Sequence, residues 1–483
     1  MATLTVMDPV TRVEGHLKVE ITIESSRGVQ QVVDARCTGT LFRGFETILA
    51  GRDPRDATVL TPRICGVCPV SHGLASSMAL EKAARVRVPG NGRLLRNLLL
   101  GSNYLQSHIL HFYLLAILDY VRGPQTAPWA PAWEVDLRED SRLSAIAGHL
   151  VQAVEARRRA HEMGAVFGGR MPLAHANIPG GITAPPTEER IARFRDHLRF
   201  LLDFVENVYV PDVEALAEVY EDYRSIGTGC GNLLTYGVFE IPDAGKTRLF
   251  RPGVVEGASS VVQPVPLGSL SEQVAYSWYD DSTDRLNPVN GKTQPLYPKG
   301  DAYSWLKAPR LRDKPFEVGP LARMWVNGDY RQGISVMDRH LARAYEALKV
   351  ARAMEEWLDR LKVGKPVYSD YQDPKDLAFG MGLTEAPRGA LGHWVWIVSG
   401  KIQGYQIVTP TCWNASPRDS AGVPGPMEQA LIGTPVEDPS RPVEALRVVH
   451  SFDPCLSCAV HVLRPGRGEG VEPWEPMPEM SLG

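Results

Sequence analysis

The chain of 483 residues has no long basic run, no internal repeat and no extended apolar segment free of polar side chains. Its net charge is −4 and its isoelectric point is about 6.3, so nothing favours a nucleic-acid partner. The N-terminus has no basic segment followed by an apolar one, so we expect no signal peptide. The most apolar stretch, Leu98–Val121, contains Asn103, Gln106 and Asp119, which predicts a buried core helix and not a membrane span.

Cysteine is scarce, with seven residues in 483. An odd count in a long chain is not typical of a disulfide framework. Cys37, Cys230 and Cys412 stand alone in the sequence, and we expect them to be small buried hydrophobic residues. The other four fall into two pairs, at Cys65 and Cys68 and at Cys455 and Cys458.

The order of periodic segments predicts an α+β fold that is predominantly α. Alternating apolar and polar residues over 17–38 predict a β-hairpin within an N-terminal region of about 1–50. Helical spacing follows over 93–120, 141–167, 187–223 and 335–361, with Thr187 as a helix start and Pro211 as a kink or break. We therefore expect a core of long helices over about 65–225 and 334–362. Gly- and Pro-rich residues at about 227–332 and 364–450 predict long irregular excursions.

No linker is evident, so residues 1–461 are expected to form one large domain. Residues 462–483 differ in character, because they contain Pro465, Pro473, Pro476 and Pro478 together with Gly466, Gly468 and Gly470. Neither a helix nor a central strand fits that composition. The change begins directly after His461.

Each cysteine pair has a two-residue gap and a histidine shortly after it: His72 follows the first pair and His461 the second. Thiolates are strong ligands for soft metals, and this gap lets both sulfur atoms of a pair face one ion. A catalytic metal site, a structural zinc site and unrelated buried cysteines all remain open on spacing alone. A thioredoxin-like redox pair is less suitable, because the expected βαβ context is absent. Two pairs so far apart predict that folding brings the ends of the chain together.

The residues around the pairs resemble the two signatures of nickel-iron hydrogenase large subunits. The first segment is Arg63-Ile-Cys65-Gly-Val-Cys68-Pro-Val-Ser-His72, and the second is Asp453-Pro-Cys455-Leu-Ser-Cys458-Ala-Val-His461. Further segments in matching order are similar to family motifs: Arg12-Val-Glu14-Gly-His16-Leu, Phe42-Arg-Gly-Phe-Glu46, Pro179-Gly-Gly-Ile-Thr183, Glu385-Ala-Pro387-Arg388-Gly-Ala-Leu-Gly-His393-Trp394 and Thr411-Cys-Trp413-Asn414. The resemblance covers nearly the whole chain.

The resemblance implies a nickel ion held by four thiolates. Cys65 and Cys455 would be terminal ligands, whereas Cys68 and Cys458 would bridge to an iron that has one carbon monoxide and two cyanide ligands. The implied reaction is reversible heterolysis of dihydrogen. The metals would take the hydride, the Cys455 thiolate would take the proton, and Glu14 would then remove it.

Other residues match supporting positions of the family. Arg388 would lie over the open face of the metal pair with Asp453 as its ion-pair partner. Pro387 and Thr411 would line the cyanide side, with the Thr411 hydroxyl donating to a cyanide nitrogen. Ser107 departs from the family, which often has an aspartate there, so the carboxylate surround of Arg388 is expected to be thinner.

The two motif histidines are implied to have different roles. His461 would bind a magnesium ion together with Glu46 and the backbone carbonyl of Ile407. His72 would donate a hydrogen bond to a sulfur atom of the nickel-iron centre. In the family a protease cuts after the histidine that matches His461, so cleavage between His461 and Val462 is expected.

The remaining single cysteines cannot hold an iron-sulfur cluster, so the electrons need a partner that has one. We expect an obligate iron-sulfur small subunit, with a dimer of heterodimers as a further assembly, and a membrane cytochrome or other acceptor beyond it. A maturation chaperone and an endopeptidase are also implied. Co-export with the small subunit favours a periplasmic or membrane-associated location, with the cytoplasm as the alternative. The alternative functions are a hydrogen sensor with little turnover, a nickel-free subunit of a respiratory complex and a structural zinc protein.

Overall fold

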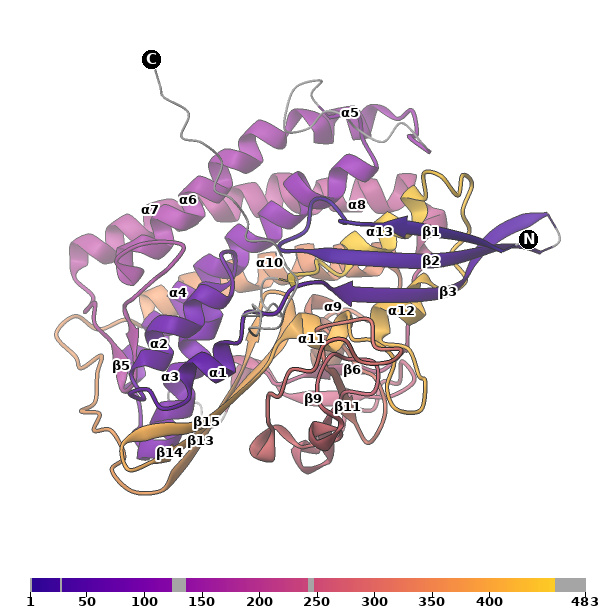
Figure 1. The fold of residues 1–483 in the computed structure, drawn as a ribbon. Helices are drawn as coiled ribbons and strands as arrows, with labels where there is room; N and C mark the ends of the chain where they lie inside the picture. Colours follow the sequence, from indigo (N-terminus) through magenta and orange to yellow (C-terminus); the bar gives the residue numbers. More distant parts are fainter. Residues whose placement is uncertain (1, 27, 124–135, 242–246, 457–483) are drawn as a thin grey trace, which may run out of the picture.

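A computed structural model describes residues 2–26, 28–123, 136–241 and 247–456. Long helices run across one side of the molecule in Figure 1, and the N-terminal sheet projects from one end. A second sheet, formed late in the sequence, lies at the opposite lower corner (Figure 1). The predicted mixed class with more helix than strand is confirmed.

The N-terminal sheet has the order β1-β2-β3, with β1 at Thr3–Met7, β2 at Leu17–Ser26 and β3 at Val29–Gly39. The pairing of β2 with β3 is antiparallel and includes Val19 opposite Cys37. The hairpin expected over 17–38 is therefore confirmed. The alternation of apolar and polar residues explains this strand, because Leu17, Val19 and Ile21 are fully buried while the residues between them are only half-buried.

The long helices pack on one another. They are α3 (Pro69–Ala84), α4 (Gly90–Leu110), α6 (Leu150–Gly168), α7 (Glu188–Phe204) and α10 (Val336–Asp359). Helix α4 contacts α6 and α10, and α7 contacts α6 and α10. Almost every residue of α4 is buried, which confirms the buried core helix expected over Leu98–Val121. Among the described residues, no helix is both long enough and apolar enough to cross a membrane.

Helix starts and breaks follow the expected local signals. The Thr187 side chain accepts a hydrogen bond from the backbone N–H of Arg190 at the start of α7. A π-helical turn at Val205–Tyr209 then separates α7 from α8 (Val210–Val219). The turn ends two residues before Pro211, whose missing N–H and ring prevent a regular α-helix there. The predicted break at Pro211 is thus confirmed.

The shorter elements surround the long helices. The short helices are α1 (Phe45–Leu49), α2 (Asp56–Leu60), α5 (Ser141–Gly148), α9 (Pro320–Asn327), α11 (Pro410–Asn414), α12 (Pro426–Leu431) and α13 (Val443–Ser451). The short strands are β4 (Asn177–Ile178), β5 (Gly181–Ile182), β6 (Leu233–Thr235), β7 (Val238–Glu240), β8 (Arg248–Phe250), β9 (Gly253–Val255), β10 (Leu270–Gln273), β11 (Ala308–Leu311) and β12 (Glu317–Val318). Residues 227–332 therefore have the short strands and long loops that their composition predicts.

The expectation of irregular chain over 364–450 is wrong for its central part. Strands β13 (Ala378–Ala386), β14 (Gly389–Val398) and β15 (Lys401–Val408) form a regular antiparallel sheet. Gly380 and Gly382 of β13 are close-approach positions and not breaks, because a Cβ on Gly380 would lie 1.8 Å from the carbonyl oxygen of Ala79 in α3 and one on Gly382 would lie 1.9 Å from that of Ala75. Two prolines of the region, Pro410 and Pro426, are the first residues of α11 and α12, where proline fits a helix.

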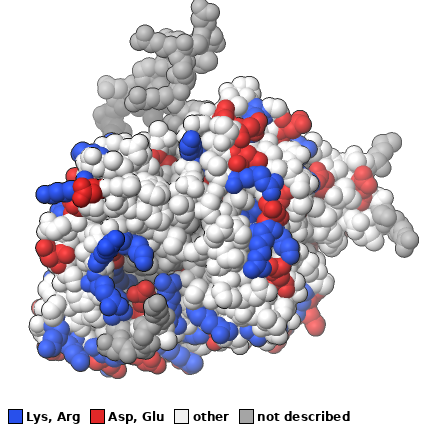
Figure 2. Space-filling view, turned by 90° about the horizontal axis from the view of Figure 1, so that it is seen from below, with Lys and Arg blue, Asp and Glu red and all other residues white. Residues whose placement is uncertain are grey.

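Charge is mixed over the face seen from below. Figure 2 shows basic and acidic side chains interspersed there around an expanse of uncharged ones. No basic field of the kind that attracts nucleic acid is visible on this face.

Candidate metal centre

Three cysteines from the two ends of the sequence meet in the interior. The sulfur atoms of Cys65, Cys68 and Cys455 all lie within 4.8 Å of one another. The sulfur atoms of Cys65 and Cys455, which are 390 positions apart, are separated by 3.1 Å. None of the three residues is more than 1% exposed. The meeting of the chain ends predicted from the sequence is thus observed for these three. Cys458, His461 and Val462 lie outside the described residues.

The first pair lies where a turn enters α3. A 3₁₀ turn at Thr61–Ile64 precedes Cys65, and Cys68 is the residue before the first turn of α3, with Pro69 following it. The Cys65 sulfur accepts hydrogen bonds from the backbone N–H groups of Val67 and Cys68, each at 3.3 Å. These bonds favour the thiolate over the thiol, because they stabilise negative charge on sulfur.

Cys455 is held by the N-terminal motif and by Thr411. A parallel backbone bridge joins Cys455 to Glu14, and the Leu456 N–H donates to the Glu14 carbonyl oxygen at 2.6 Å. The Cys455 N–H donates to the Thr411 hydroxyl oxygen at 3.0 Å, which leaves the hydroxyl proton of Thr411 available for another acceptor. Glu14 and Thr411 therefore position Cys455 through its backbone.

Arg388 is a buried cation beside the three sulfur atoms. It is 2% exposed, and its Nη2 forms an ion pair with Asp453 Oδ1 at 3.0 Å. Burial alone would lower the pKa of Arg388, but Asp453 and the cysteine sulfur atoms raise it well above its usual range. Its Nε and Nη1 have no hydrogen-bond partner among the described residues. Ser107 of α4 is fully buried, and its hydroxyl likewise lacks a hydrogen-bond partner among the described residues.

The turn before Arg388 is held by Arg323, which sequence reasoning missed. All five N–H groups of the Arg323 guanidinium donate at 2.5–3.0 Å. The acceptors are the carboxylates of Glu346 and Glu385 and the carbonyl oxygens of Ala386 and Pro387. Both carboxylates are completely buried. The motif beginning at Glu385 hinted at a partner, but no local pattern identifies an arginine 62 residues earlier.

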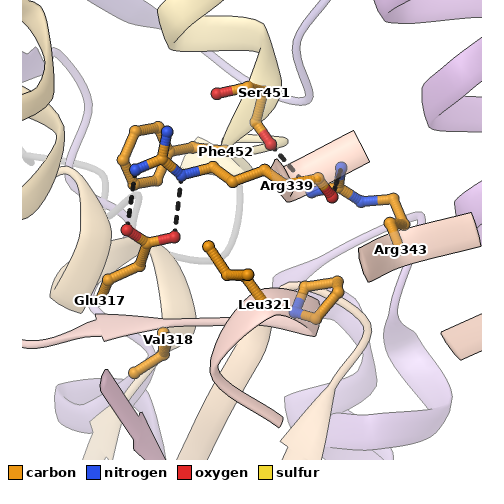
Figure 3. A pocket seen from close by; sticks show the side chains of 8 residues that line it. Glu317, Val318, Leu321, Arg339, Arg343, Ser451 and Phe452 are labelled. Carbon is orange, nitrogen blue, oxygen red and sulfur yellow. Dashed lines mark hydrogen bonds and ion pairs between the residues drawn. The ribbon is translucent and has the colours of Figure 1, made fainter. Parts of the chain in front are cut away.

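The segment that leads into Cys455 is held by two arginines of α10 (Figure 3). Arg339 donates twice to the Glu317 carboxylate at 2.8 Å and lies over the Phe452 ring at 3.8 Å from its centroid. Arg343 donates to the Ser451 carbonyl oxygen at 3.0 Å. These residues line a cavity of about 10 Å³, which is room for about one water molecule. This packing fixes the backbone just before Asp453.

Glu14 lies at the edge of the site. A Cβ placed on Gly66 would be 3.5 Å from Glu14 Oε1, so the carboxylate lies against the loop between Cys65 and Cys68. Glu14 is half-buried, whereas Gly66, Arg63 and His16 are exposed. The loop between the two buried cysteines Cys65 and Cys68 therefore reaches the surface of this chain.

A second group of predicted ligands also meets. Glu46 is 6% exposed, and its Oε1 accepts a hydrogen bond from the Ile407 N–H at 2.8 Å. Its other oxygen accepts one from the Thr293 hydroxyl. The structure records the N–H of Ile407 in this contact, so a metal-binding role for its carbonyl stays a prediction.

His72 contacts a second buried histidine. Its Nδ1 lies 3.1 Å from Nε2 of His393, and its Nε2 has no hydrogen-bond partner among the described residues. Burial lowers the pKa of His72 to about 4, against the opposing effect of Cys65. A bond from His72 to a cluster sulfur stays a prediction, since Cys458 is outside the described residues.

The single cysteines are buried with one exception. Cys37 and Cys412 are buried, as expected, but Cys230 is only half-buried. Its position between two left-handed glycines, Gly229 and Gly231, places it on a turn.

Comparison with known proteins shows which kind of metal site these cysteines belong to. A family model described as nickel-dependent hydrogenase matches residues 43–127, 121–333 and 326–461, and one described as HoxL-like matches residues 4–34. The chain belongs to the nickel-dependent hydrogenase family. The periplasmic [NiFeSe] hydrogenase large subunit of Desulfomicrobium baculatum is 44% identical, over 96% of each chain. The hydrogenase-1 large chain of Escherichia coli is 33% identical, over 95% of each.

Solved structures agree. The reduced Ni-Fe-Se hydrogenase of Desulfovibrio vulgaris Hildenborough matches with a TM-score of 0.91 and 44% identity, over 95% of this chain and 100% of that one. The chain is thus the catalytic large subunit of a nickel-dependent hydrogenase, and the sensor, nickel-free and zinc alternatives are set aside. The predicted recognition and enzyme class are confirmed.

Proposed function

We propose that this hydrogenase holds its nickel-iron pair with four cysteine thiolates, Cys65, Cys68, Cys455 and Cys458. The observation that supports this most directly is the buried meeting of three of these sulfur atoms from opposite ends of the sequence. The relatives with 44% identity are selenium-containing enzymes by name, whereas the sequence of this chain has only cysteine at these positions. It would be an all-sulfur counterpart. When bound, the metal pair, with carbon monoxide and two cyanides on iron, supplies the site where dihydrogen is split heterolytically.

The residues that are present fit such a group. Buried sulfur atoms suit a soft metal, and the unpartnered Nε–H and Nη1–H of Arg388 offer donors beside them. Arg388 would polarise the bound gas or hold a water, while Asp453 fixes its guanidinium. The Thr411 hydroxyl, already held by the Cys455 N–H, would donate its own proton to a cyanide nitrogen, with Pro387 packed alongside. Ser107 cannot supply the second carboxylate, so Asp453 would balance Arg388 with less help.

We assign proton transfer to Cys455 and Glu14. The Cys455 sulfur would receive the proton, and the Glu14 carboxylate would remove it toward the surface. The backbone bridge between the two residues keeps them adjacent. The Glu14 carboxylate beside Gly66 is half-buried, so it borders both the protein interior and the surface of this chain. Helices α4, α6, α7 and α10 would serve as the rigid bundle that fixes this arrangement.

Substitution of Glu14 by Gln tests the assignment. The enzyme should retain nickel and iron near one each but lose about 10²–10⁴-fold in dihydrogen-dependent dye reduction. Glu24→Gln is the matched control, because Glu24 is an exposed glutamate of the neighbouring β2 and should leave turnover unchanged. Full turnover in Glu14→Gln would assign the proton route elsewhere. Zinc, or no metal, in the unmodified enzyme would reject the nickel-iron site itself.

Magnesium would bind near Glu46, with His461 and the carbonyl of Ile407 as further ligands. A buried carboxylate suits a hard cation. The buried Lys307 ammonium forms its ion pair with Glu272, at 3.2 Å, and so leaves the Glu46 carboxylate for a metal ion. Magnesium retained after chelation in the unmodified enzyme and lost in Glu46→Gln would support this site.

We propose that an iron-sulfur small subunit covers the edge where Gly66, Arg63 and His16 are exposed. Electrons must leave the buried sulfur atoms there, and the described part of this chain offers no second cysteine cluster. Exposed apolar side chains at Leu41, Ile48 and Val59 lie in the segment that leads to Cys65, as expected of a stable interface. Co-export with that subunit would give a periplasmic or membrane-associated enzyme, which passes electrons to a cytochrome or other acceptor. Active, monomeric large subunit would overturn this proposal.

Residues 1–461 would form the mature single domain. The family model match stops at residue 461, which supports cleavage between His461 and Val462 by an endopeptidase, with a chaperone delivering the metals. Intact mass of the active enzyme should correspond to residues ending at His461. Retention of residues 462–483 in active enzyme would refute processing.

A further inference from the structure

Three buried side chains form a hydrogen-bonded row beside the metal centre. His72 of α3 contacts His393 of β14, with Nδ1 and Nε2 separated by 3.1 Å. The other ring nitrogen of His393, Nδ1, lies 2.8 Å from the hydroxyl oxygen of Tyr405 on β15. Both histidines are fully buried and Tyr405 is 3% exposed. The row therefore crosses from the helix that begins after Cys68 through two strands of the sheet.

The His72 end of the row lies on the helix that follows Cys68. Cys68 is the N-cap of α3 and His72 lies one turn later, so both are on the same face, and a helical side chain leans toward the N-terminus. The ring nitrogen of His72 that does not contact His393, Nε2, has no hydrogen-bond partner among the described residues. Cys65 is near enough to oppose the effect of burial on the pKa of His72.

Each member of the row has a defined protonation. A phenol keeps its proton at neutral pH. Burial lowers the pKa of His393 well below its ordinary value, so its imidazole is neutral. A neutral imidazole has one N–H and one acceptor nitrogen. Two directions of donation are then possible along the row, and they place the proton of His72 on opposite ring nitrogens.

The hydroxyl of Tyr405 selects between them. If Tyr405 accepted from His393, its own buried proton would need another acceptor, and the described residues provide none in its recorded contacts. Leaving a buried donor unpaired is unfavourable. If Tyr405 donates to Nδ1 of His393, then His393 must donate through Nε2 to Nδ1 of His72, and His72 must have its proton on Nε2.

We propose that Tyr405 and His393 are positioning residues that fix the tautomer of His72, so that an Nε2–H is always presented to the sulfur atoms of the metal centre. This rests on the proposed nickel-iron site. An N–H directed at a thiolate stabilises its negative charge, whereas a ring lone pair in the same place would repel it. The row would thus set the electron density on the metal-bound sulfur without contacting the metals.

Neutron diffraction from deuterium-exchanged crystals of the nickel-loaded enzyme tests the direction itself. Deuterium is expected on Nε2 of both His72 and His393, and on the Tyr405 oxygen in the line toward His393. Deuterium on Nδ1 of His72 would overturn the proposal. This measurement requires no variant, so it stands even if a substitution prevents folding.

Variants of the row give a second readout. Tyr405→Phe removes the donor and should lower kcat by about 10-fold with KM unchanged. It should also change the coupling of ¹⁵N-labelled histidine to nickel in electron paramagnetic resonance. Tyr236→Phe is the matched control, because Tyr236 is a buried tyrosine whose hydroxyl has no partner in the described chain. Equal spectra and rates for the two variants would overturn the proposal.

Substitutions of His393 separate direction from packing. His393→Gln keeps an acceptor oxygen for Tyr405 and a donor nitrogen for His72, so it should retain most of the coupling and rate. His393→Met fills the space but keeps neither, so it should match Tyr405→Phe. An equal loss of coupling and of turnover rate in His393→Gln and His393→Met would contradict a directional role. Nickel content and turnover of the unmodified enzyme are measured first, and their absence would refute the proposed function separately.

Discussion

The close packing of α3 on the sheet predicts a large effect of one methyl group. Gly382 of β13 lies against α3 so tightly that a Cβ would be 1.9 Å from the Ala75 carbonyl oxygen. An ordinary contact begins near 3.4 Å, so strand and helix would have to separate by about 1.5 Å. Gly404 of β15 is the control, because a Cβ there meets nothing within 4 Å.

Two consequences should follow from Gly382→Ala. Overpacking of this kind costs about 1–3 kcal/mol or more, a substantial part of a total stability of about 5–15 kcal/mol. Because α3 begins directly after Cys68, its displacement also moves a proposed metal ligand. A shift of about 1 Å at a reacting centre can cost about 10²-fold in rate.

The assay compares Gly382→Ala with Gly404→Ala. Denaturant unfolding gives the change in free energy, and nickel content with dihydrogen-dependent dye reduction gives turnover per nickel. Gly404→Ala should be neutral or more stable by about 0.4–1 kcal/mol, since alanine restricts the unfolded chain. Equal stability and turnover per nickel in the two variants would refute the packing argument.

Two further predictions concern the buried charges. Arg323→Met leaves the buried carboxylates of Glu346 and Glu385 without their cation and should lower unfolding free energy by about 3–5 kcal/mol. The control, Arg158→Met, removes only exposed ion pairs and should change little; equal losses would contradict the difference. Burial lowers the pKa of His340 to about 3, so the unfolded chain binds this proton first as pH falls. His340 should therefore cost stability progressively below about pH 6.5, and His340→Phe should flatten the dependence of unfolding free energy on pH between 7 and 5. An unchanged slope would show that His340 does not contribute.

Much of the site was predictable because its residues occur in short ordered motifs. The residue type and spacing of Cys65, Cys68 and Cys455 predict a metal site. Arg388 is found in the same way, because it lies in a motif beside Pro387. The hairpin and the helices followed from alternation and helical spacing, which are local properties. Such signals need no knowledge of which segments become neighbours.

The features that sequence reasoning missed depend on distant neighbours. Arg323 becomes important only because Glu346 and Glu385 converge on it. The glycines of β13 suggest breaks in a single sequence, yet Gly380 and Gly382 serve a strand that touches a helix 300 residues earlier. Local propensity describes one segment at a time, and a close approach between two segments has no local signature.

The bridge between Glu14 and Cys455 has a consequence for synthesis. The backbone that positions Cys455 is provided in part by the first residues made, while Cys455 itself is separated from Cys65 by 390 positions. At about 5–20 residues per second, the ribosome needs about 20–80 s to make that stretch. During this interval the early thiols have no late partner, so a nascent chain exposes half of a metal site to any ion or oxidant in the cell. The chaperone that the family resemblance implies would be most useful during that interval, before the two ends of the chain meet.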